Sequence, residues 1–232
     1  MSKSFAFSAL DWPTTEPHPC LQEQTLLQNR SVDLTPGADA VEEAELAMRL
    51  ILMAGQKNMS GAGERHKDWW NNATVDDTPV LNGKTVGLVG YTPASRMLAR
   101  RAHFGFGMKA TFFDDTGLPP EILSETSATQ SSLEELLAES DVVSMHLSGA
   151  NRRHVLNGPK LDLMRPSALL INATGGNQIN PLALSNMLMF DLIAGAGLVV
   201  ETDGTRCDTT LTQCPTVVTV GRDTSTRPQH IQ

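Results

Sequence analysis

The chain has 232 residues, of which 40% are hydrophobic and 19% charged, and it carries a formal net charge of −8. This length suits one large domain or one domain with appendages, and the negative charge argues against a nucleic-acid partner, which would need a basic face. No run of about 18 apolar residues occurs along the chain, so we expect neither a transmembrane helix nor a membrane partner.

The first segment, residues 1–34, shows no sustained hydrophobic periodicity and contains three prolines. We expect an irregular arm there, with one short strand near residues 5–10. The segment also lacks the apolar stretch of a secretory signal, which favours a cytoplasmic protein.

A helical segment is expected over residues 35–80, after a turn at Thr35-Pro36-Gly37. Residues 38–53 place apolar side chains three or four positions apart, which predicts an amphipathic helix. Glutamates lie in its first turns, where negative charge suits the helix N-terminus. Residues 56–79 form a polar stretch with no predicted element.

From Leu81 onward, short apolar runs alternate with helical segments. The predicted strands lie at 85–89, 109–113, 142–147, 168–172, 193–200 and 216–220. The predicted helices lie at 94–104, 132–138 and 181–189, with a helical turn at 161–164. Apolar strands that alternate with helices indicate an α/β fold with a doubly wound parallel sheet of the Rossmann type, whose ligands lie at the carboxyl ends of the strands. We expect this nucleotide-binding domain over residues 81–223, followed by a tail at 224–232.

The loop after the first predicted strand has part of a dinucleotide-binding pattern. That pattern needs three glycines, for the tight turn, for the approach of the pyrophosphate, and for packing of helix on strand. Only the first, Gly90, is present, with Thr92 and Ser95 at the other two positions. Thr92 places a β-branched side chain where the diphosphate would lie, although its hydroxyl could instead donate to a phosphate or cap the helix. Plain α/β scaffolding is the alternative interpretation of this loop.

Asp114 lies 24 residues after Gly90, at the end of the next predicted strand. An acid at that place accepts hydrogen bonds from the adenosine ribose of NAD and disfavours the 2′-phosphate of NADP. A solvated carboxylate at a strand end is an equal alternative.

The three cysteines are Cys20, Cys207 and Cys214. This sparse, odd number favours reduced thiols in a cytosol-like compartment. Cys207 and Cys214 could form a metal or redox pair, but no further ligands stand at zinc-site spacing, so we expect ordinary loop cysteines and no metal.

Several blocks together resemble the D-isomer-specific 2-hydroxyacid dehydrogenases. Residues 81–87 read L-N-G-K-T-V-G, residues 132–147 read S-L-E-E-L-L-A-E-S-D-V-V-S-M-H-L, and residues 163–172 and 193–198 match later blocks. The resemblance covers residues 35–223 and implies NAD as cofactor and a homodimer formed through the helix at 38–53. It assigns these residues to the cofactor site: Gly90, Tyr91, Thr92, Ala94, Ser95, Asp114, Leu147, Ala173 and Thr174.

The positions that the resemblance marks as catalytic are changed. The substrate-binding Arg of the family's N-T-A-R-G-G block is Gly175 here, its Glu is Gly204, and its acid/base His is Arg222, or Gly221 with a one-residue slip. Its cofactor-contacting Asp is Val199, which together with Thr92 weakens the expected NAD site. Without the Arg, a 2-oxo acid loses its bidentate anchor, and without the His no group is suited to pass the proton.

Three hypotheses follow. The favoured one is a catalytically degenerate relative that acts through nucleotide binding or assembly. The alternative is an NAD-dependent oxidoreductase with a rebuilt site, for which His146, Asp203 and Arg222 are the weak catalytic candidates. The third is an interaction module whose nucleotide site is also lost. The resemblance also implies a separate substrate domain before residue 35, so residues 1–34 are interpreted as its remnant and the domain as largely absent.

Overall fold

The computed structural model of the chain describes residues 38–59, 80–115, 128–147, 154–175, 178–201 and 216–222, with Leu211 and Cys214. The described residues all belong to one compact unit, Thr35–Gln232. The strand expected near residues 5–10 and the tail at 224–232 lie outside the described residues.

Seven strands form one parallel sheet. They are β1 (Thr85–Val89), β2 (Lys109–Phe113), β3 (Ala128–Gln130), β4 (Val142–Met145), β5 (Leu169–Asn172), β6 (Gly195–Glu201) and β7 (Val217–Arg222). The strand order is β3-β2-β1-β4-β5-β6-β7, and every neighbouring pair is parallel. The chain therefore reverses its direction of winding between β1 and β4, which confirms the doubly wound α/β fold.

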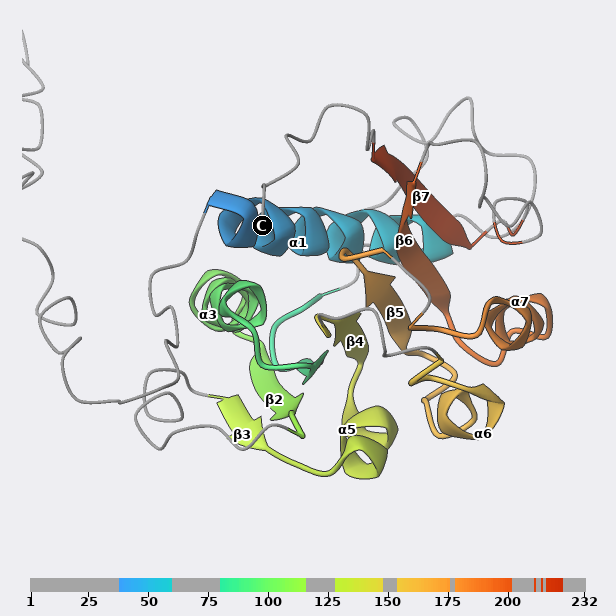
Figure 1. The fold of residues 1–232 in the computed structure, drawn as a ribbon. Helices are drawn as coiled ribbons and strands as arrows, with labels where there is room; N and C mark the ends of the chain where they lie inside the picture. The colour runs from blue at the N-terminus through green and yellow to red at the C-terminus, as the bar shows by residue number, and fades with distance from the viewer. Residues whose placement is uncertain are drawn as a thin grey trace, which may run out of the picture. The chain divides into compact units, whose positions relative to one another are not determined.

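Helices cover both faces of the sheet (Figure 1). One face carries α1 (Ala38–Met59) and α3 (Pro93–Phe106), which pack on each other. The other face carries α5 (Leu133–Glu139), α6 (Gly158–Leu161) and α7 (Pro181–Met189). Since α1 contacts β5, β6 and β7 while α3 contacts β1 and β2, the two helices together cover most of their face.

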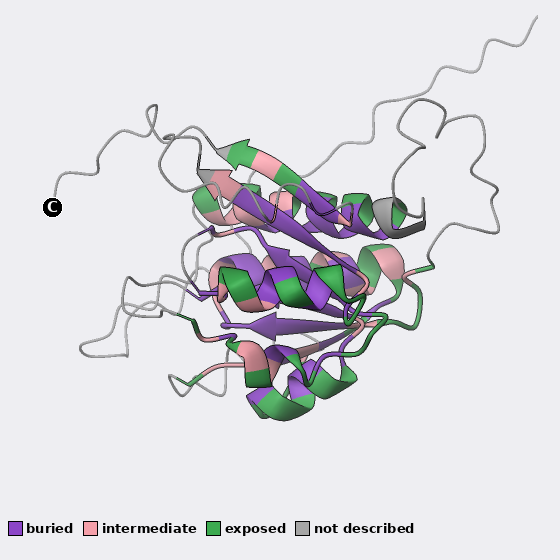
Figure 2. Ribbon diagram, turned by 90° about the vertical axis from the view of Figure 1, so that its right-hand side faces the viewer, coloured by how far each residue is buried: buried purple, intermediate pink, exposed green. Residues whose placement is uncertain are grey.

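The core is split by the sheet into two apolar layers. Phe112 and Leu88 face the layer under α1 and α3, to which α1 contributes Leu50. Leu170 and Met145 face the layer under the other three helices. In Figure 2 the central strands are buried while the helices show exposed residues on their outer sides. Side chains of successive strand residues thus alternate between two cores, as expected for a sheet covered on both faces.

Local capping fixes where several helices begin. Asn180 caps α7 by accepting from the Ala183 backbone N–H at 3.0 Å. At α5, the Ser132 hydroxyl accepts from the Glu135 N–H at 3.2 Å, and the Glu135 carboxylate accepts from the Ser132 N–H at 3.2 Å, which forms a capping box. The Ser132 hydroxyl also donates to that carboxylate at 2.8 Å. These hydrogen bonds from Ser132 hold the pKa of the Glu135 carboxyl below its ordinary value.

Some predicted elements differ from the observed ones. Strand β3 was not predicted, because its three residues are mostly exposed and owe their strand conformation to pairing with β2. The helical turn expected at 161–164 is instead α6, which begins earlier because Asn157 caps it and a proline lies in its first turn. Helix α1 continues to Met59, beyond the predicted end at residue 53. Strand β4 ends at Met145, two residues before the predicted end.

Candidate functional site

The candidate site lies at the carboxyl ends of β1, β2, β4 and β5, where the strand order reverses. In parallel sheets of this type, ligands bind in the crevice outside these strand ends. The structure brings four of the predicted site segments to this edge: the loop from Gly90, the end of β2 at Asp114, the end of β4 at Leu147, and the residues after β5.

Gly90 makes the turn between β1 and α3. Its φ of 98° lies in the region that favours glycine, and its N–H donates to the Phe113 carbonyl at 2.8 Å. A Cβ at this position would stand 2.9 Å from the backbone of His146 and Leu147. The turn therefore passes so close over the end of β4 that only a glycine fits without movement of the backbone.

Tyr91 and Asp114 hold the rest of the turn in place. The Tyr91 N–H donates to the Asp114 carboxylate at 2.7 Å. Tyr91 is 4% exposed, and its ring stacks on Phe112 with ring centroids 3.9 Å apart. Asp114 thus stands where a ribose-binding acid is expected, and it also fixes the loop of β1 against the end of β2.

Thr92 caps helix α3. Its backbone is extended, with φ −81° and ψ 167°, and its side-chain oxygen accepts from the Ser95 N–H at 3.3 Å. The Ser95 hydroxyl donates back to the Thr92 carbonyl at 2.9 Å, and Ala94 beside it is buried. The helix N-terminus still suits an anion, but the Thr92 side chain already binds an N–H that a phosphate would use.

His146 is buried and joins β4 to helix α1. Its side chain has 0% exposure, and its Nδ1 lies 2.7 Å from the Glu43 carboxylate. Its Nε2 lies 2.9 Å from the Ser144 hydroxyl. Glu43 thus engages one ring nitrogen and Ser144 the other. Both nitrogens are thus engaged within the fold, and neither is turned toward a ligand.

A polar cluster closes the ends of β4 and β5. Asn172 accepts from the Gly175 N–H at 3.1 Å and donates to the Gly175 carbonyl at 3.4 Å. The Thr174 hydroxyl lies 2.9 Å from the Asn172 amide oxygen and 3.2 Å from that of Gln178. The Gln178 amide N–H donates to the carbonyl of Leu147. Ala173, between these residues, is buried under the α1 and α3 face.

The structure describes only part of the other predicted positions. Val199 is 7% exposed and belongs to the core under α1 and α3. Asp203 and Gly204 lie outside the described residues. The backbone of Arg222 pairs with that of Glu201 across β6 and β7, and its side chain also lies outside the described part.

Two residues that contribute to the site could not be identified from the sequence. Glu43 lies 103 positions before His146, and Gln178 lies 31 positions after Leu147, so neither contact leaves a local pattern. A glutamate in the first turns of a helix is ordinary helix chemistry. For Gln178, the sequence shows only a polar residue two positions before Asn180, which caps α7. Ile179, between them, is buried.

The described residues hold neither a candidate metal cluster nor a candidate membrane-spanning helix. No group of three or more His, Cys, Asp or Glu side chains there could hold a metal ion. Cys214 is buried, whereas Cys207 lies outside the described part. None of the described helices is long and apolar enough to cross a membrane.

The edge partly fits a dinucleotide. Gly90 provides the tight turn, α3 provides an N-terminus, and Asp114 provides an acid at the second strand. The Thr92 side chain stands against that fit at the diphosphate position. The hydrogen bonds of the Gly175 cluster between described residues come from amides and a hydroxyl.

Comparison with known proteins shows which family and which proteins this chain is similar to. A family model described as "D-isomer specific 2-hydroxyacid dehydrogenase, NAD binding domain" matches residues 48–221. A glyoxylate reductase of Thermococcus litoralis is 35% identical over 173 residues, which cover 72% of this chain and 52% of that protein. A hydroxypyruvate reductase of Thermotoga maritima is 30% identical over 171 residues, 72% of this chain and 53% of that protein.

Solved structures similar to this chain include an enzyme of the same kind. The crystal structure of a glyoxylate reductase from Paecilomyes thermophila superposes with a TM-score of 0.68 at 30% identity, over 80% of this chain and 56% of that one. The chain spans about half the length of the curated relatives it matches.

Proposed function

Because the chain belongs to the D-isomer-specific 2-hydroxyacid dehydrogenase family through its NAD-binding domain, we propose that it binds a dinucleotide without reducing a 2-oxo acid. NAD is the cofactor of this domain type. The proposal makes the protein a catalytically degenerate relative that acts through binding and assembly. It also places the protein in the cytoplasm, because three cysteines favour reduced thiols.

The main support for this proposal is the residue at position 175. The resemblance puts the substrate-binding arginine there, and the residue is a buried glycine with φ 74°. The Asn172 side chain contacts both its N–H and its carbonyl. A 2-oxo acid carboxylate would meet neutral amides at this place and would lose the bidentate charge-assisted pair of a guanidinium.

Two histidines support the same conclusion. His146 follows β4 at the candidate site, and both nitrogens of its ring are engaged by Glu43 and Ser144. His103 lies in the last turn of α3, at the opposite edge of the sheet, where its Nδ1 contacts the Met108 carbonyl. Neither ring is placed to pass the proton that accompanies hydride transfer.

The test separates binding from turnover. Titration of the purified chain with NADH should give measurable heat and should raise the thermal midpoint, since a ligand of the native state stabilises it. NADH absorbance should not fall faster than in the protein-free blank when glyoxylate, hydroxypyruvate or 4-methyl-2-oxopentanoate is added. The Thermococcus litoralis glyoxylate reductase is the positive control.

Two results would contradict this proposal. Turnover that survives stringent purification and disappears on substitution of Arg222 would support a working oxidoreductase with a rebuilt site. Absence of any heat or thermal shift at millimolar NADH would support an interaction module without a nucleotide site.

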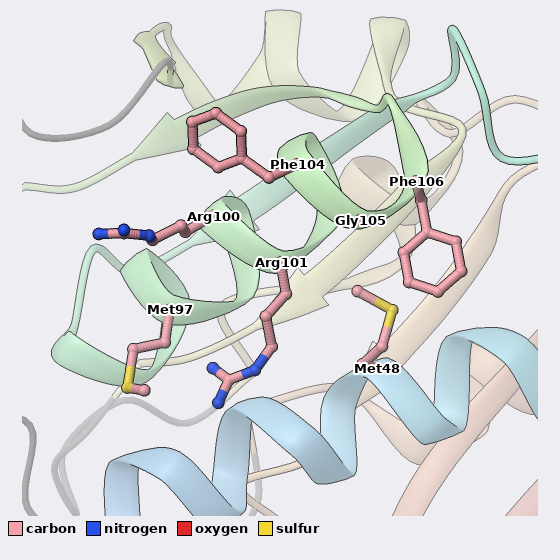
Figure 3. A pocket seen from close by; sticks show the side chains of 7 residues that line it. All are labelled: Met48, Met97, Arg100, Arg101, Phe104, Gly105 and Phe106. Atoms are coloured by element: carbon pink, nitrogen blue, oxygen red, sulfur yellow. The ribbon is translucent and has the colours of Figure 1, made fainter. Parts of the chain in front are cut away.

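We also propose that two copies of the chain associate through the face formed by α1 and α3. A surface pocket opens between these helices, lined by side chains that include Met48, Met97 and Phe104 (Figure 3). Phe104 is 76% exposed. Arg100 and Arg101 lie on the same face, and Arg101 pairs with Glu45 at 3.5 Å.

Charge and symmetry favour a second copy as the occupant. The first turns of α1 are acidic while α3 carries arginines. A two-fold axis that runs between the acidic and the basic part of this patch would set the acidic part of one α1 against the arginines of the other copy, and the reverse. An exposed phenylalanine beside this pocket would then be covered.

Phe104→Glu is expected to shift the protein from dimer to monomer, because a carboxylate would be buried at the centre of the contact. Light scattering after size-exclusion chromatography measures this directly. Phe190→Glu is the matched control, since Phe190 is 69% exposed at the end of α7 on the opposite face. A wild-type monomer, or dimers in both variants, would refute this interface.

A further inference from the structure

We infer that Gln178 is a positioning residue that sets the distance between the ends of β4 and β5 and so shapes the part of the site that holds the second nucleoside of the dinucleotide. The inference rests on the proposed nucleotide binding. It concerns a residue that the cofactor motifs do not include.

The backbone at Gln178 is fixed independently of its side chain. The Gln178 carbonyl accepts from the Leu156 N–H at 3.1 Å, and the Asn180 N–H donates to the Leu156 carbonyl at 2.9 Å. Ile179, between them, forms a parallel bridge with Leu156. The side chain therefore extends from a rigid base just before α7.

The Gln178 side chain spans two neighbouring strand ends. Its amide N–H donates to the carbonyl of Leu147, which follows β4. Its amide oxygen lies 3.2 Å from the hydroxyl of Thr174, which follows β5. One side chain thus connects both segments, and because Gln178 is only 7% exposed, little water competes for either contact.

The position of these strand ends relates the contacts of Gln178 to the nucleotide site. Asp114 marks the adenosine half of the site at the end of β2, and α3 begins at the centre. A dinucleotide that crosses from β2 over Gly90 places its second nucleoside beyond β4, above Leu147 and Thr174. A change in the spacing of those two residues would alter that half of the site and leave the adenosine half intact.

Burial of a primary amide also calls for a reason other than packing. An apolar side chain of similar length would fill the same space without the desolvation of a buried polar group. The two hydrogen bonds compensate that cost only if the amide stays between Leu147 and Thr174. The amide therefore specifies one arrangement of the strand ends.

The test compares binding of the complete dinucleotide NADH with binding of its adenosine half. Gln178→Met keeps the length and removes both hydrogen bonds. We expect it to weaken NADH binding by about fivefold in calorimetric titration and to change the binding of ADP, which lacks the second nucleoside, by less than about twofold. Gln56→Met, an exposed glutamine of α1, is the control and should change neither affinity.

A second variant keeps the inference testable if Gln178→Met fails to fold. Thr174→Val removes the hydroxyl that Gln178 contacts, and it should lower NADH affinity selectively, whereas Thr174→Ser should restore it. Equal weakening of both ligands, or no change for NADH, would refute the role of Gln178. Failure of the wild-type chain to bind either ligand would refute the proposed nucleotide binding itself.

Discussion

Replacement of Gly90 by alanine is expected to lower the free energy of unfolding by about 3 kcal/mol or more. A positive φ costs an L-residue about 1–2 kcal/mol. In addition, the new Cβ would lie 2.9 Å from three backbone atoms of His146 and Leu147, and backbone cannot rotate away as a flexible side chain can. Relief of such overpacking costs about 1–3 kcal/mol more. Urea unfolding followed by circular dichroism measures the change.

Gly105→Ala provides the matched control. Gly105 lies inside α3, and a Cβ there would meet nothing within 4 Å. Alanine should therefore stabilise the helix by about 0.5–1 kcal/mol. If Gly90→Ala unfolded at the same urea concentration as the wild type, the close crossing of the turn over β4 would be wrong.

The sequence predicts those elements whose signals are local. Strands β1 and β2 and helix α7 have the bounds that were expected, because apolar runs, glycine and a proline at the helix start mark them directly. Strand β3 carries no such signal: its residues are mostly exposed, and pairing with β2 alone makes them a strand. Its existence depends on tertiary structure, which local propensity does not contain.

The site residues also differ in whether a local sequence signal marks them. Gly90, Thr92 and Asp114 could be placed from the sequence because a strand, a turn and a helix in that order fix their positions. The hydrogen bonds that define the roles of His146 and Thr174 come from Glu43 and Gln178, which belong to other elements. Hydrogen bonds between distant segments are determined by packing, so sequence analysis could list His146 only as a weak catalytic candidate.

Two substitutions of Thr92 should separate its bulk from its hydroxyl. Thr92→Gly is expected to tighten NADH binding by about 10- to 100-fold, because it frees the Ser95 N–H and clears the approach of the diphosphate. Since glycine is an acceptable helix cap, stability should fall by only about 0.5 kcal/mol or less. Calorimetric titration and urea unfolding of the same preparation measure both quantities.

Thr92→Val is the complementary variant, which keeps the branched side chain and removes the capping oxygen. Its NADH affinity should equal that of the wild type, because the branched side chain still keeps the diphosphate away from the freed Ser95 N–H. Its unfolding free energy should fall by about 1 kcal/mol through loss of the cap on Ser95. Affinity would then follow the bulk of residue 92, and stability would follow its hydroxyl. If valine weakened binding instead, the threonine hydroxyl would be donating to the phosphate. The residue would then be a substitute for the missing glycine and no longer an obstacle.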